Sequence, residues 1–268
     1  MVLVDGKKIA REIYAEVKEA VRQKKESPVL LVFTCNPNFE TVRYLELKTA
    51  KAKELGIILD VVFLESSATT AEVIKNIQDS APKCQGILVQ LPLPAHLDTD
   101  KIIASVPPEY DVDAFSYEGE ETIVLPPVIG AIAEIIKVHK LDLRGKRVVI
   151  FGAGRLVGKP AKAFVLTHGA LVQVIDRDLV SEEVIKQTLE ADFIILGVGK
   201  PGLLTDNMIK PGAVVFDAGA SEDGGILVGD ADPSVADKAS LLSPVPGGIG
   251  PITVAVLFRN LVNLMNRQ

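Results

Sequence analysis

The sequence predicts an α/β fold made of two α/β domains, each a parallel sheet with covering helices. Short apolar runs alternate with amphipathic helical patterns through residues 1–125, and the alternation restarts in residues 141–250. A glycine-rich turn follows the first apolar run of this second series. The C-terminal segment 252–268 is predicted to form a helix that joins the first domain.

The first domain starts with a helix over residues 7–24, because apolar residues recur there at helical spacing between charged ones. An apolar run bounded by Pro and Asn predicts a buried strand next. Strands and helices then alternate, which is typical of a parallel sheet. The predicted elements are strand 28–35, helix 40–55, strand 57–64, helix 70–79, strand 86–90 and helix 98–104.

The second domain follows a helix predicted at about residues 130–139. A helix runs from the glycine-rich turn to about Thr167, and the last helix of the chain starts behind Gly250-Pro251, since Pro is pre-set for a first helical turn. The predicted strands of this domain are 147–151, 171–175, 193–196 and 213–216.

Composition excludes several classes of function. A net charge of -6 argues against a nucleic-acid or anionic-membrane surface, because both require clustered Lys and Arg. The apolar runs are far shorter than the roughly 20 residues of a membrane-spanning helix. The N-terminus has its charges after its short apolar run, unlike a secretory signal, so we expect a cytoplasmic protein.

The cysteines and histidines indicate no metal site. Cys35 and Cys84 are too few and too far apart for a disulfide framework or a thiolate site, and we expect both in the core. His96, His139 and His168 lack paired ligand spacing. We therefore predict no metal.

The glycine-rich turn Gly152-Ala153-Gly154-Arg155-Leu-Val-Gly158 lies between a predicted strand and a predicted helix, which favours a dinucleotide site. Glycines there allow a tight turn and close approach of a pyrophosphate, whose charge the helix N-terminus favours. The spacing G-x-G-x-x-x-G is one residue longer than the usual fingerprint. A plain strand-to-helix turn is the alternative.

Two later features support the dinucleotide site. Asp176 ends the second strand, where a carboxylate accepts hydrogen bonds from an adenosine ribose. Gly197 and Gly199 follow the third strand at the carboxyl edge, where backbone without side chains approaches a flat ring. The alternatives are an exposed turn aspartate and a simple loop.

Polar residues of the first domain suggest a second site. Tyr44 and Lys48 are four apart on a predicted helix and share one face with Lys51, although a solvated basic face explains the same pattern. Gln90 closes an apolar strand before a Pro-stiffened turn, as a hydrogen-bond anchor or a ligand contact. Asp111 and Asp113 lie in a loop at the boundary of the domain, as ligand contacts or as aspartates that merely terminate structure.

In combination, these motifs resemble the bifunctional methylenetetrahydrofolate dehydrogenase/methenyltetrahydrofolate cyclohydrolase family along nearly the whole chain. The motifs are Tyr44-x-x-x-Lys48, the segment Gln85-Gly-Ile-Leu-Val-Gln-Leu-Pro-Leu-Pro94, Asp111-Val-Asp113, the Gly152 turn and the segment Ser243-Pro-Val-Pro-Gly-Gly-Ile-Gly-Pro-Ile-Thr-Val-Ala255. The resemblance implies an N-terminal folate-binding catalytic domain, a Rossmann-like NAD(P)-binding domain, a cleft between them and a homodimer.

The resemblance also implies roles for individual residues. Lys48 matches the catalytic lysine, Gln90 its hydrogen-bond partner, and Tyr44 the tyrosine that stacks near the folate. Asp113 matches the carboxylate that holds the pterin, and Pro246-Gly247-Gly248 passes close to nicotinamide and pterin. The expected reaction is oxidation of methylene-tetrahydrofolate with NAD or NADP, and hydrolysis of the methenyl product to 10-formyl-tetrahydrofolate.

The sequence departs from the family pattern mainly on the cofactor side. Ala153 stands where the family commonly offers an arginine to a ribose phosphate, and with Asp176 it favours NAD over NADP, although Arg155 and Arg177 favour the opposite. Other departures are Leu125-Pro-Pro-Val128, Ala114 and Gly219-Ala-Ser221. A dehydrogenase without cyclohydrolase activity, a non-catalytic folate- or nucleotide-binding relative, and a dehydrogenase of another substrate are the alternative functions.

Overall fold

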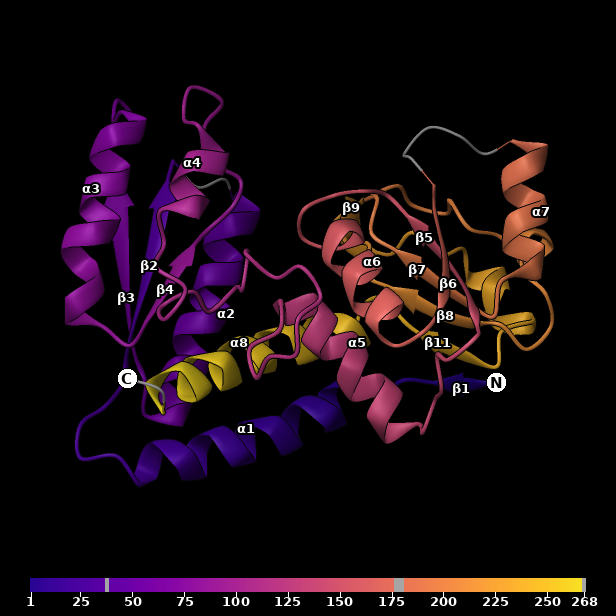
Figure 1. Cartoon of the computed structure of the whole chain (residues 1–268), viewed down its shortest axis with the longest axis horizontal. Coiled ribbons are helices and arrows are strands. Elements are labelled where there is room, and N and C mark those ends of the chain that lie inside the picture. Colours follow the sequence, from indigo (N-terminus) through magenta and orange to yellow (C-terminus); the bar gives the residue numbers. More distant parts are fainter. Residues whose placement is uncertain (37–38, 176–180, 267–268) are drawn as a thin grey trace. The chain divides into compact units, whose positions relative to one another are not determined.

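The computed structural model describes residues 1–36, 39–175 and 181–266, leaving aside the side chains of residues 39, 40, 43 and 44. The chain forms two compact units, each with its own parallel sheet (Figure 1). The three-stranded unit comprises Glu12–Ser116, Thr122–Leu125 and Val254–Gln268. The six-stranded unit comprises Met1–Arg11, Tyr117–Glu121 and Pro126–Thr253. The predicted α/β class is confirmed.

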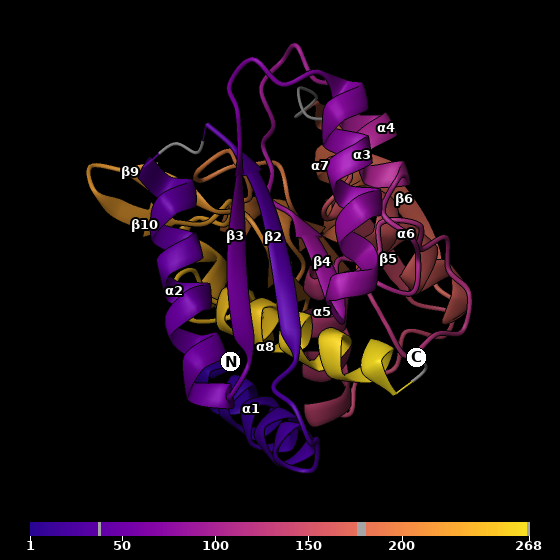
Figure 2. The ribbon, with the colours of Figure 1, turned by 90° about the vertical axis from the view of Figure 1, so that its left-hand side faces the viewer.

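The sheet of the three-stranded unit has the order β3-β2-β4, and Figure 2 shows its strands side by side. Its strands are β2 (Val29–Cys35), β3 (Ile58–Leu64) and β4 (Gly86–Val89). The helices α2 (Phe39–Leu55) and α3 (Thr70–Ser80) lie on opposite sides of this sheet (Figure 1). Short elements η1 (Ala81–Lys83) and α4 (Thr99–Ala104) follow α3 and β4.

One face of this sheet packs against α3 and α4. Phe33 of β2 and Ile87 of β4 share a buried cluster with Ile77 of α3 and Ile102 of α4, all 1% exposed or less. Burial of such side chains contributes roughly 1.5–3 kcal/mol each. This packing fixes the strand ends that carry the polar residues of the site. Cys35 and Cys84 are buried in the same cluster, as predicted.

The sheet of the six-stranded unit is parallel throughout, with the order β1-β11-β8-β7-β5-β6. Its strands are β1 (Val2–Leu3), β5 (Arg147–Phe151), β6 (Leu171–Ile175), β7 (Phe193–Leu196), β8 (Val214–Asp217) and β11 (Leu241–Ser243). Its helices are α5 (Pro127–Val138), α6 (Gly158–Thr167) and α7 (Glu182–Glu190), with η2 (Asp206–Met208) and η3 (Pro233–Asp237). A hairpin of β9 (Ser221–Asp223) and β10 (Ile226–Val228) stands apart from this sheet.

Two long helices, α1 (Gly6–Arg22) and α8 (Ile249–Met265), each contain residues of both units. The helix α1 starts in the six-stranded unit, and α8 ends in the three-stranded unit. Residues of α8 from Val254 onward group with the three-stranded unit. In contrast, the first eleven residues group with the six-stranded unit, because β1 pairs with β11. The predicted domain limits 1–125 and 141–250 stay a prediction.

Several short elements were not predicted. They are β1, β9, β10, β11, α7 and the short elements η1, η2 and η3, of which only α7 and η3 are longer than three residues. Among the predicted elements, the limits differ by three residues at most. No helix within residues 1–36, 39–175 and 181–266 combines the length and apolar character that crossing a bilayer requires.

Candidate active site

Lys48 and Gln90 meet in the three-stranded unit. Lys48 lies on α2, the helix that covers one side of the sheet, and Gln90 directly follows β4. Gln90 therefore lies at the carboxyl edge of the sheet. Lys48 Nζ donates a hydrogen bond of 2.8 Å to Gln90 Oε1. The two residues are 42 positions apart in sequence, and both are half-buried. This pairing was expected from the family resemblance.

The amide of Gln90 is held in one orientation. Gln90 Nε2 donates to the carbonyl of Leu91 at 2.9 Å, and the backbone N–H of Gln90 donates to the carbonyl of Phe33 at 2.8 Å. Since the Nε2 side of the amide has a backbone acceptor, Oε1 is left to accept from Lys48. The pair therefore has a fixed direction, with the lysine as donor.

Burial and charge act on the ionisation of Lys48 and Asp113 in opposite ways. Burial lowers the pKa of Lys48 below its ordinary value, and the Asp113 carboxylate offsets part of that shift. Burial and the charge of Asp111 raise the pKa of Asp113 to about 7, against the attraction of Lys48. Both groups thus titrate closer to neutrality than they would in water, which suits groups that exchange protons or bind a polar ring.

Asp111 organises the loop that carries Asp113. Its carboxylate accepts from the backbone N–H groups of Asp113 at 3.0 Å and Phe115 at 2.7 Å. Burial raises the pKa of Asp111 to about 6, and these backbone hydrogen bonds limit the rise. Ala114 in this loop has φ +50°, a left-handed conformation that favours glycine, so its lack of a glycine costs about 1 kcal/mol.

The same loop is tied to β4 and to α8. The N–H of Ile87 donates to the carbonyl of Tyr110 at 2.7 Å, so the loop lies along β4. Asn260 of α8, 1% exposed, donates through Nδ2 to the carbonyls of Val112 at 2.9 Å and Leu125 at 2.7 Å. Asn260 was not identified from the sequence, because asparagines in an apolar helix carry no local signal of the carbonyls that they reach.

Lys51 is not part of this cluster. Its ammonium pairs with Glu54 at 2.5 Å and lies 4.8 Å from the ring centroid of Tyr14. Glu54 and burial raise the pKa of that tyrosine to about 12, with burial the larger cause. Tyr44 lies on α2 one turn before Lys48, and its side chain is outside the described part of the structure.

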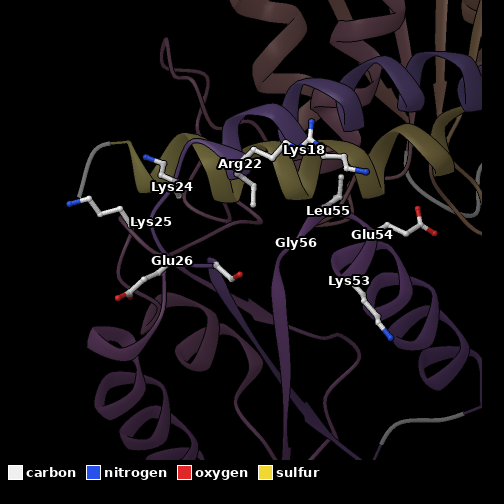
Figure 3. A pocket seen from close by; sticks show the side chains of 11 residues that line it. Lys18, Arg22, Lys24, Lys25, Glu26, Lys53, Glu54, Leu55 and Gly56 are labelled. Atoms are coloured by element: carbon white, nitrogen blue, oxygen red, sulfur yellow. The ribbon is translucent and has the colours of Figure 1, made fainter.

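A basic hollow lies at the other edge of the same sheet. Its volume is about 380 Å³, and it is lined at the C-terminal ends of α1 and α2 and just before β2 and β3 (Figure 3). Its cationic side chains are Lys18, Arg22, Lys24, Lys25 and Lys53. It lacks Lys48, Gln90 and Asp113, so it is separate from the cluster described above.

In the six-stranded unit, the glycine-rich turn joins β5 to α6. Gly152 has φ +91°, and its N–H donates to the carbonyl of Ile175 at 2.8 Å. A Cβ on Gly158 would lie 1.9 Å from the carbonyl oxygen of Gly152, so the helix can start this close to the turn only with glycine. Apart from Gly154 and its chain neighbours, no atom of the described residues lies within 4 Å of the position that a Cβ on Gly154 would take, so a ligand has room to approach the backbone there.

The loop after β7 lies beside this turn. A Cβ on Gly152 would approach the carbonyl oxygen of Gly197 to 3.2 Å, and a Cβ on Gly197 would meet Val157 at 2.5 Å. Gly199 has φ +73°. The carboxyl edge of β5 and β7 thus carries two adjoining stretches of glycine-rich backbone, which is where ligands of open α/β sheets bind.

The side chains expected to select the cofactor are only partly visible. Ala153 and Arg155 are exposed on the glycine-rich turn. Asp176 and Arg177 lie outside the described residues. The expected roles of these four residues in ribose recognition therefore stay predictions.

The Pro246-Gly247-Gly248 segment follows β11 in the six-stranded unit and is built against the start of α1. Gly6 donates its N–H to the carbonyl of Gly247 at 2.9 Å, and a Cβ on Gly6 would lie 1.8 Å from the carbonyl oxygen of Gly248. Gly247 has φ +109°. Gly6 thus supports this segment, a role that the sequence analysis did not assign.

Comparison with known proteins identifies the family to which these two sites belong. The model of the tetrahydrofolate dehydrogenase/cyclohydrolase catalytic domain matches residues 4–113, and the model of the NAD(P)-binding domain of the same family matches residues 126–268. The chain belongs to the tetrahydrofolate dehydrogenase/cyclohydrolase family. The resemblance stated from the sequence is confirmed.

Relatives match this family member over its whole length. The bifunctional protein FolD of Moorella thermoacetica is 38% identical, covering 99% of each chain, and that of Nautilia profundicola is 36% identical, covering 98% of this chain and 96% of the relative. The crystal structure of the bifunctional FolD enzyme of Campylobacter jejuni is 35% identical and covers 100% of both chains, with a TM-score of 0.93.

The activity follows from this membership. The chain oxidises 5,10-methylenetetrahydrofolate to 5,10-methenyltetrahydrofolate with a nicotinamide dinucleotide, and hydrolyses the product to 10-formyltetrahydrofolate. The glycine-rich backbone at the edge of β5 and β7 fits the dinucleotide, because close approach there needs the glycines that are present. The described residues contain no group of His, Cys, Asp or Glu side chains suited to a metal ion.

Proposed function

We propose that Lys48, held in place by Gln90, transfers the protons of the cyclohydrolase step. The observation that carries this proposal is the 2.8 Å hydrogen bond from Lys48 Nζ to Gln90 Oε1, on a lysine whose pKa burial lowers. An amine that loses its proton more readily can act as a general base and return the proton as a general acid. The methenyl substrate is a cation, so a less strongly protonated lysine also repels it less.

In the proposed reaction, a water oxygen bonds to the methenyl carbon while Lys48 takes the proton that this water loses. A proton then passes from the hydroxyl of the adduct to the ring nitrogen as the bond between carbon and that nitrogen breaks. One proton is released overall, and the formyl group remains. Gln90 keeps the amine in place, because its own amide is fixed by the carbonyl of Leu91.

We assign pterin recognition to Asp113 and stacking near the folate to Tyr44. A carboxylate accepts two parallel hydrogen bonds from the amino-pyrimidine edge of a pterin. Asp113 suits this role, because the hydrogen bond from its backbone N–H to the Asp111 carboxylate holds its backbone in place. Its carboxylate also attracts the Lys48 ammonium. We propose that Pro246, Gly247 and Gly248 line the ring-binding surface, where two residues lack side chains.

We assign dinucleotide binding to Gly152, Gly154 and Gly158 and to the loop of Gly197 and Gly199. The turn precedes α6, whose N-terminal amides and dipole favour a pyrophosphate. The bound dinucleotide supplies the acceptor for the hydride of the methylene group. The chain supplies the alignment of the two rings.

We propose that the chain prefers NAD to NADP. Ala153 offers no guanidinium to a ribose phosphate, and a carboxylate at Asp176 about 4 Å from a 2′-phosphate would cost on the order of 4 kcal/mol per charge pair at an effective dielectric of about 20, less after solvent screening. Arg155 and Arg177 oppose this preference. The Trypanosoma brucei relative, 28% identical over 99% of this chain with a TM-score of 0.91, was crystallised with NADP.

The ratio of kcat/KM for NAD to that for NADP tests the preference. We expect a ratio above one for the unaltered enzyme, and about a tenfold fall for Asp176→Ser, because the change removes the repulsion of a 2′-phosphate. Asp178→Ser, two positions on, is the control for the loss of a charge. A tenfold preference of the unaltered enzyme for NADP would show the proposal wrong, and an unchanged ratio in Asp176→Ser would show that the carboxylate does not set it.

We also propose a cytoplasmic homodimer. The two cysteines are unpaired and buried, as is usual in a reducing compartment. Among the described strands, β3 pairs only with β2, and on it Ile58 and Phe63 are 52% and 68% exposed. An apolar edge strand of this kind is suited to contact a second copy of the chain.

Sedimentation equilibrium tests the dimer. We expect twice the mass of one chain at micromolar concentration, and a shift toward one chain for Phe63→Glu, since a buried charge would weaken the contact. Ile226→Glu is the control, because Ile226 is 66% exposed on β10 in the other unit. A monomeric unaltered enzyme would contradict the dimer, and an unaffected Phe63→Glu dimer would contradict the edge-strand contact.

A further inference from the structure

Asn260 is an amide buried in an otherwise apolar stretch of α8. It is 1% exposed, and its helix neighbours Leu257, Phe258 and Leu261 are 4% exposed or less. Burying an amide costs free energy unless hydrogen bonds compensate it. The backbone groups that Asn260 reaches therefore indicate what this residue holds in place.

The Asn260 amide bridges two carbonyls from another part of the chain. Its Nδ2 donates to the carbonyl of Val112 at 2.9 Å and to that of Leu125 at 2.7 Å. A nitrogen that donates twice belongs to a primary amide or to a charged group, and a charge would be costly at this burial. Of the chain between the two carbonyls, Tyr117–Glu121 belongs to the six-stranded unit. Asn260 thus holds both ends of this excursion.

The carbonyl of Val112 belongs to the peptide unit that precedes Asp113. This unit is planar, and both of its polar groups are hydrogen-bonded. Its C=O accepts from Asn260, and its N–H, which is that of Asp113, donates to Asp111 Oδ1 at 3.0 Å. The peptide unit is therefore held from both sides, and with it the backbone from which the Asp113 side chain starts.

The loop, β4 and α8 pack closely at one glycine. A Cβ on Gly86, the first residue of β4, would lie 2.7 Å from Cγ1 of Val112 and 2.6 Å from Cδ1 of Leu261. Val112 itself is 0% exposed. Because Gly86 has no side chain, α8 comes near enough to the loop for Asn260 to reach the Val112 carbonyl.

The loop that Asn260 holds is under backbone strain. Ala114, the residue after Asp113, has φ +50°, a conformation that residues other than glycine avoid. Release of this strain favours other conformations of the loop, so the observed one depends on the contacts that hold it. The hydrogen bonds of Asn260 and Asp111 on the peptide unit before Asp113 are contacts of this kind.

We propose that Asn260 is a positioning residue for the substrate, which sets where the Asp113 carboxylate meets the pterin by holding the Val112 carbonyl. The inference rests on the proposed role of Asp113 in pterin recognition. Two parallel hydrogen bonds to a flat edge tolerate little displacement of the carboxylate, because hydrogen bonds weaken steeply as their geometry departs from the ideal. Without Asn260, Asp113 keeps its carboxylate but loses its fixed place.

The first test is the affinity for tetrahydrofolate in Asn260→Leu, measured by calorimetry at pH 8. Leucine is close to asparagine in size but has no donor, so both carbonyls lose their partner. We expect the Kd of tetrahydrofolate to rise about tenfold, the effect of weakening a charged hydrogen bond. The Kd of the dinucleotide should stay within twofold, because its proposed binding residues belong to the six-stranded unit. An unchanged Kd of tetrahydrofolate, or an equal rise for both ligands, would overturn the inference.

Asn263→Leu is the matched control on the same helix. Asn263 lies three residues further along α8 and donates to the carbonyl of Ile123 at 2.8 Å. The same change of residue type there removes a hydrogen bond from α8 but leaves the peptide unit before Asp113 held, so we expect the Kd of tetrahydrofolate within twofold of the unaltered enzyme. A tenfold rise in this variant too would contradict a specific role for Asn260.

Combination with Asp113→Asn tests whether Asn260 acts through Asp113. If it does, Asn260→Leu should raise the Kd of tetrahydrofolate threefold or less in an Asp113→Asn enzyme, because effects on one shared interaction do not add. A full tenfold rise in that background would overturn the inference. If Asp113→Asn alone left the Kd unchanged, the proposed role of Asp113 would fail as well, whereas a raised Kd in Asp113→Asn with an unchanged one in Asn260→Leu would refute this inference alone.

Hydrogen exchange of the Asp113 N–H tests the same arrangement in the unaltered enzyme. We expect slow exchange without any ligand, since the peptide unit is held before the pterin arrives, and faster exchange in Asn260→Leu. An N–H that exchanges fast until tetrahydrofolate is added would show that the ligand, and not Asn260, orders the loop. That result would overturn the inference even if Asn260→Leu does not fold.

Discussion

Lys48→Met is expected to lower the rate of methenyltetrahydrofolate hydrolysis by about 10² to 10⁴, the usual contribution of a general acid–base group. Methionine keeps the length and the apolar stem of lysine, so the fold should be retained. The oxidation step has no proton for Lys48 to transfer, and we expect it to fall by about tenfold at most. Added methylene-tetrahydrofolate and dinucleotide should then give a methenyl absorbance that rises and persists.

Lys51→Met is the matched control for this prediction. Lys51 lies three residues further along α2 and pairs with Glu54 at 2.5 Å, away from Gln90. The same change of residue type at that position should leave hydrolysis within twofold of the unaltered enzyme. Hydrolysis that persists in Lys48→Met within threefold of the unaltered rate would remove Lys48 from the proton transfers.

The regular part of the fold could be predicted from the sequence because its signals are local. Helical spacing of apolar residues located α2 and α3, and apolar runs bounded by turns located β2 and β5. The helix α7 could also have been found, since Ser181 caps it and Glu182 and Glu183 occupy its first turn. The strands β1 and β11, of two and three residues, are set by pairing across the sheet and have no local pattern.

The site was predictable where motif and topology coincide. The family resemblance implied that Gln90 is the partner of Lys48, and the two meet because Gln90 follows β4 and Lys48 lies on α2, which covers the sheet. The supports of the site were not predictable in this way. Asn260 acts through backbone groups that are distant in sequence, and only the folded chain shows which carbonyls it reaches.

The departures from the family pattern acquire different meanings in the structure. Ala114 occupies a left-handed conformation, with φ +50°, where the family has glycine, so this departure costs backbone strain beside Asp113. At Gly219-Ala-Ser221, the glycine is the residue whose missing Cβ makes room for Asp230, and it is retained. The first departure thus adds backbone strain to the loop of Asp113. The second leaves the buried glycine in place and changes the residues that follow it.

Asp113→Asn is expected to raise the Kd of tetrahydrofolate about 100-fold at pH 8, because it removes the charge from a pair of hydrogen bonds to the pterin. The unaltered enzyme should also bind less tightly as the pH falls below about 7, the pKa to which burial and Asp111 raise Asp113. Binding requires the ionised form, so the Kd should rise about tenfold per pH unit there. The Asp113→Asn enzyme should lack this dependence.

Stability should change in the opposite direction, which distinguishes a binding role from a structural one. The folded pKa of Asp113 is above its unfolded value of about 3.9, so the folded state binds more protons between pH 4 and pH 7, and stability falls as the pH rises through that range. Asp113→Asn removes this cost and should be about 1–3 kcal/mol more stable at pH 8 in urea unfolding.

Asp79→Asn, at an exposed position of α3, is the control for loss of one negative charge, and neither its Kd nor its stability should change. If Asp113→Asn is more stable but binds tetrahydrofolate less tightly, the buried carboxylate serves binding at a cost in stability. A residue that served the fold alone would not show this combination. If Asp113→Asn instead lost stability and affinity together, Asp113 would be a support of its loop, as Asp111 is, and the pterin would need another partner.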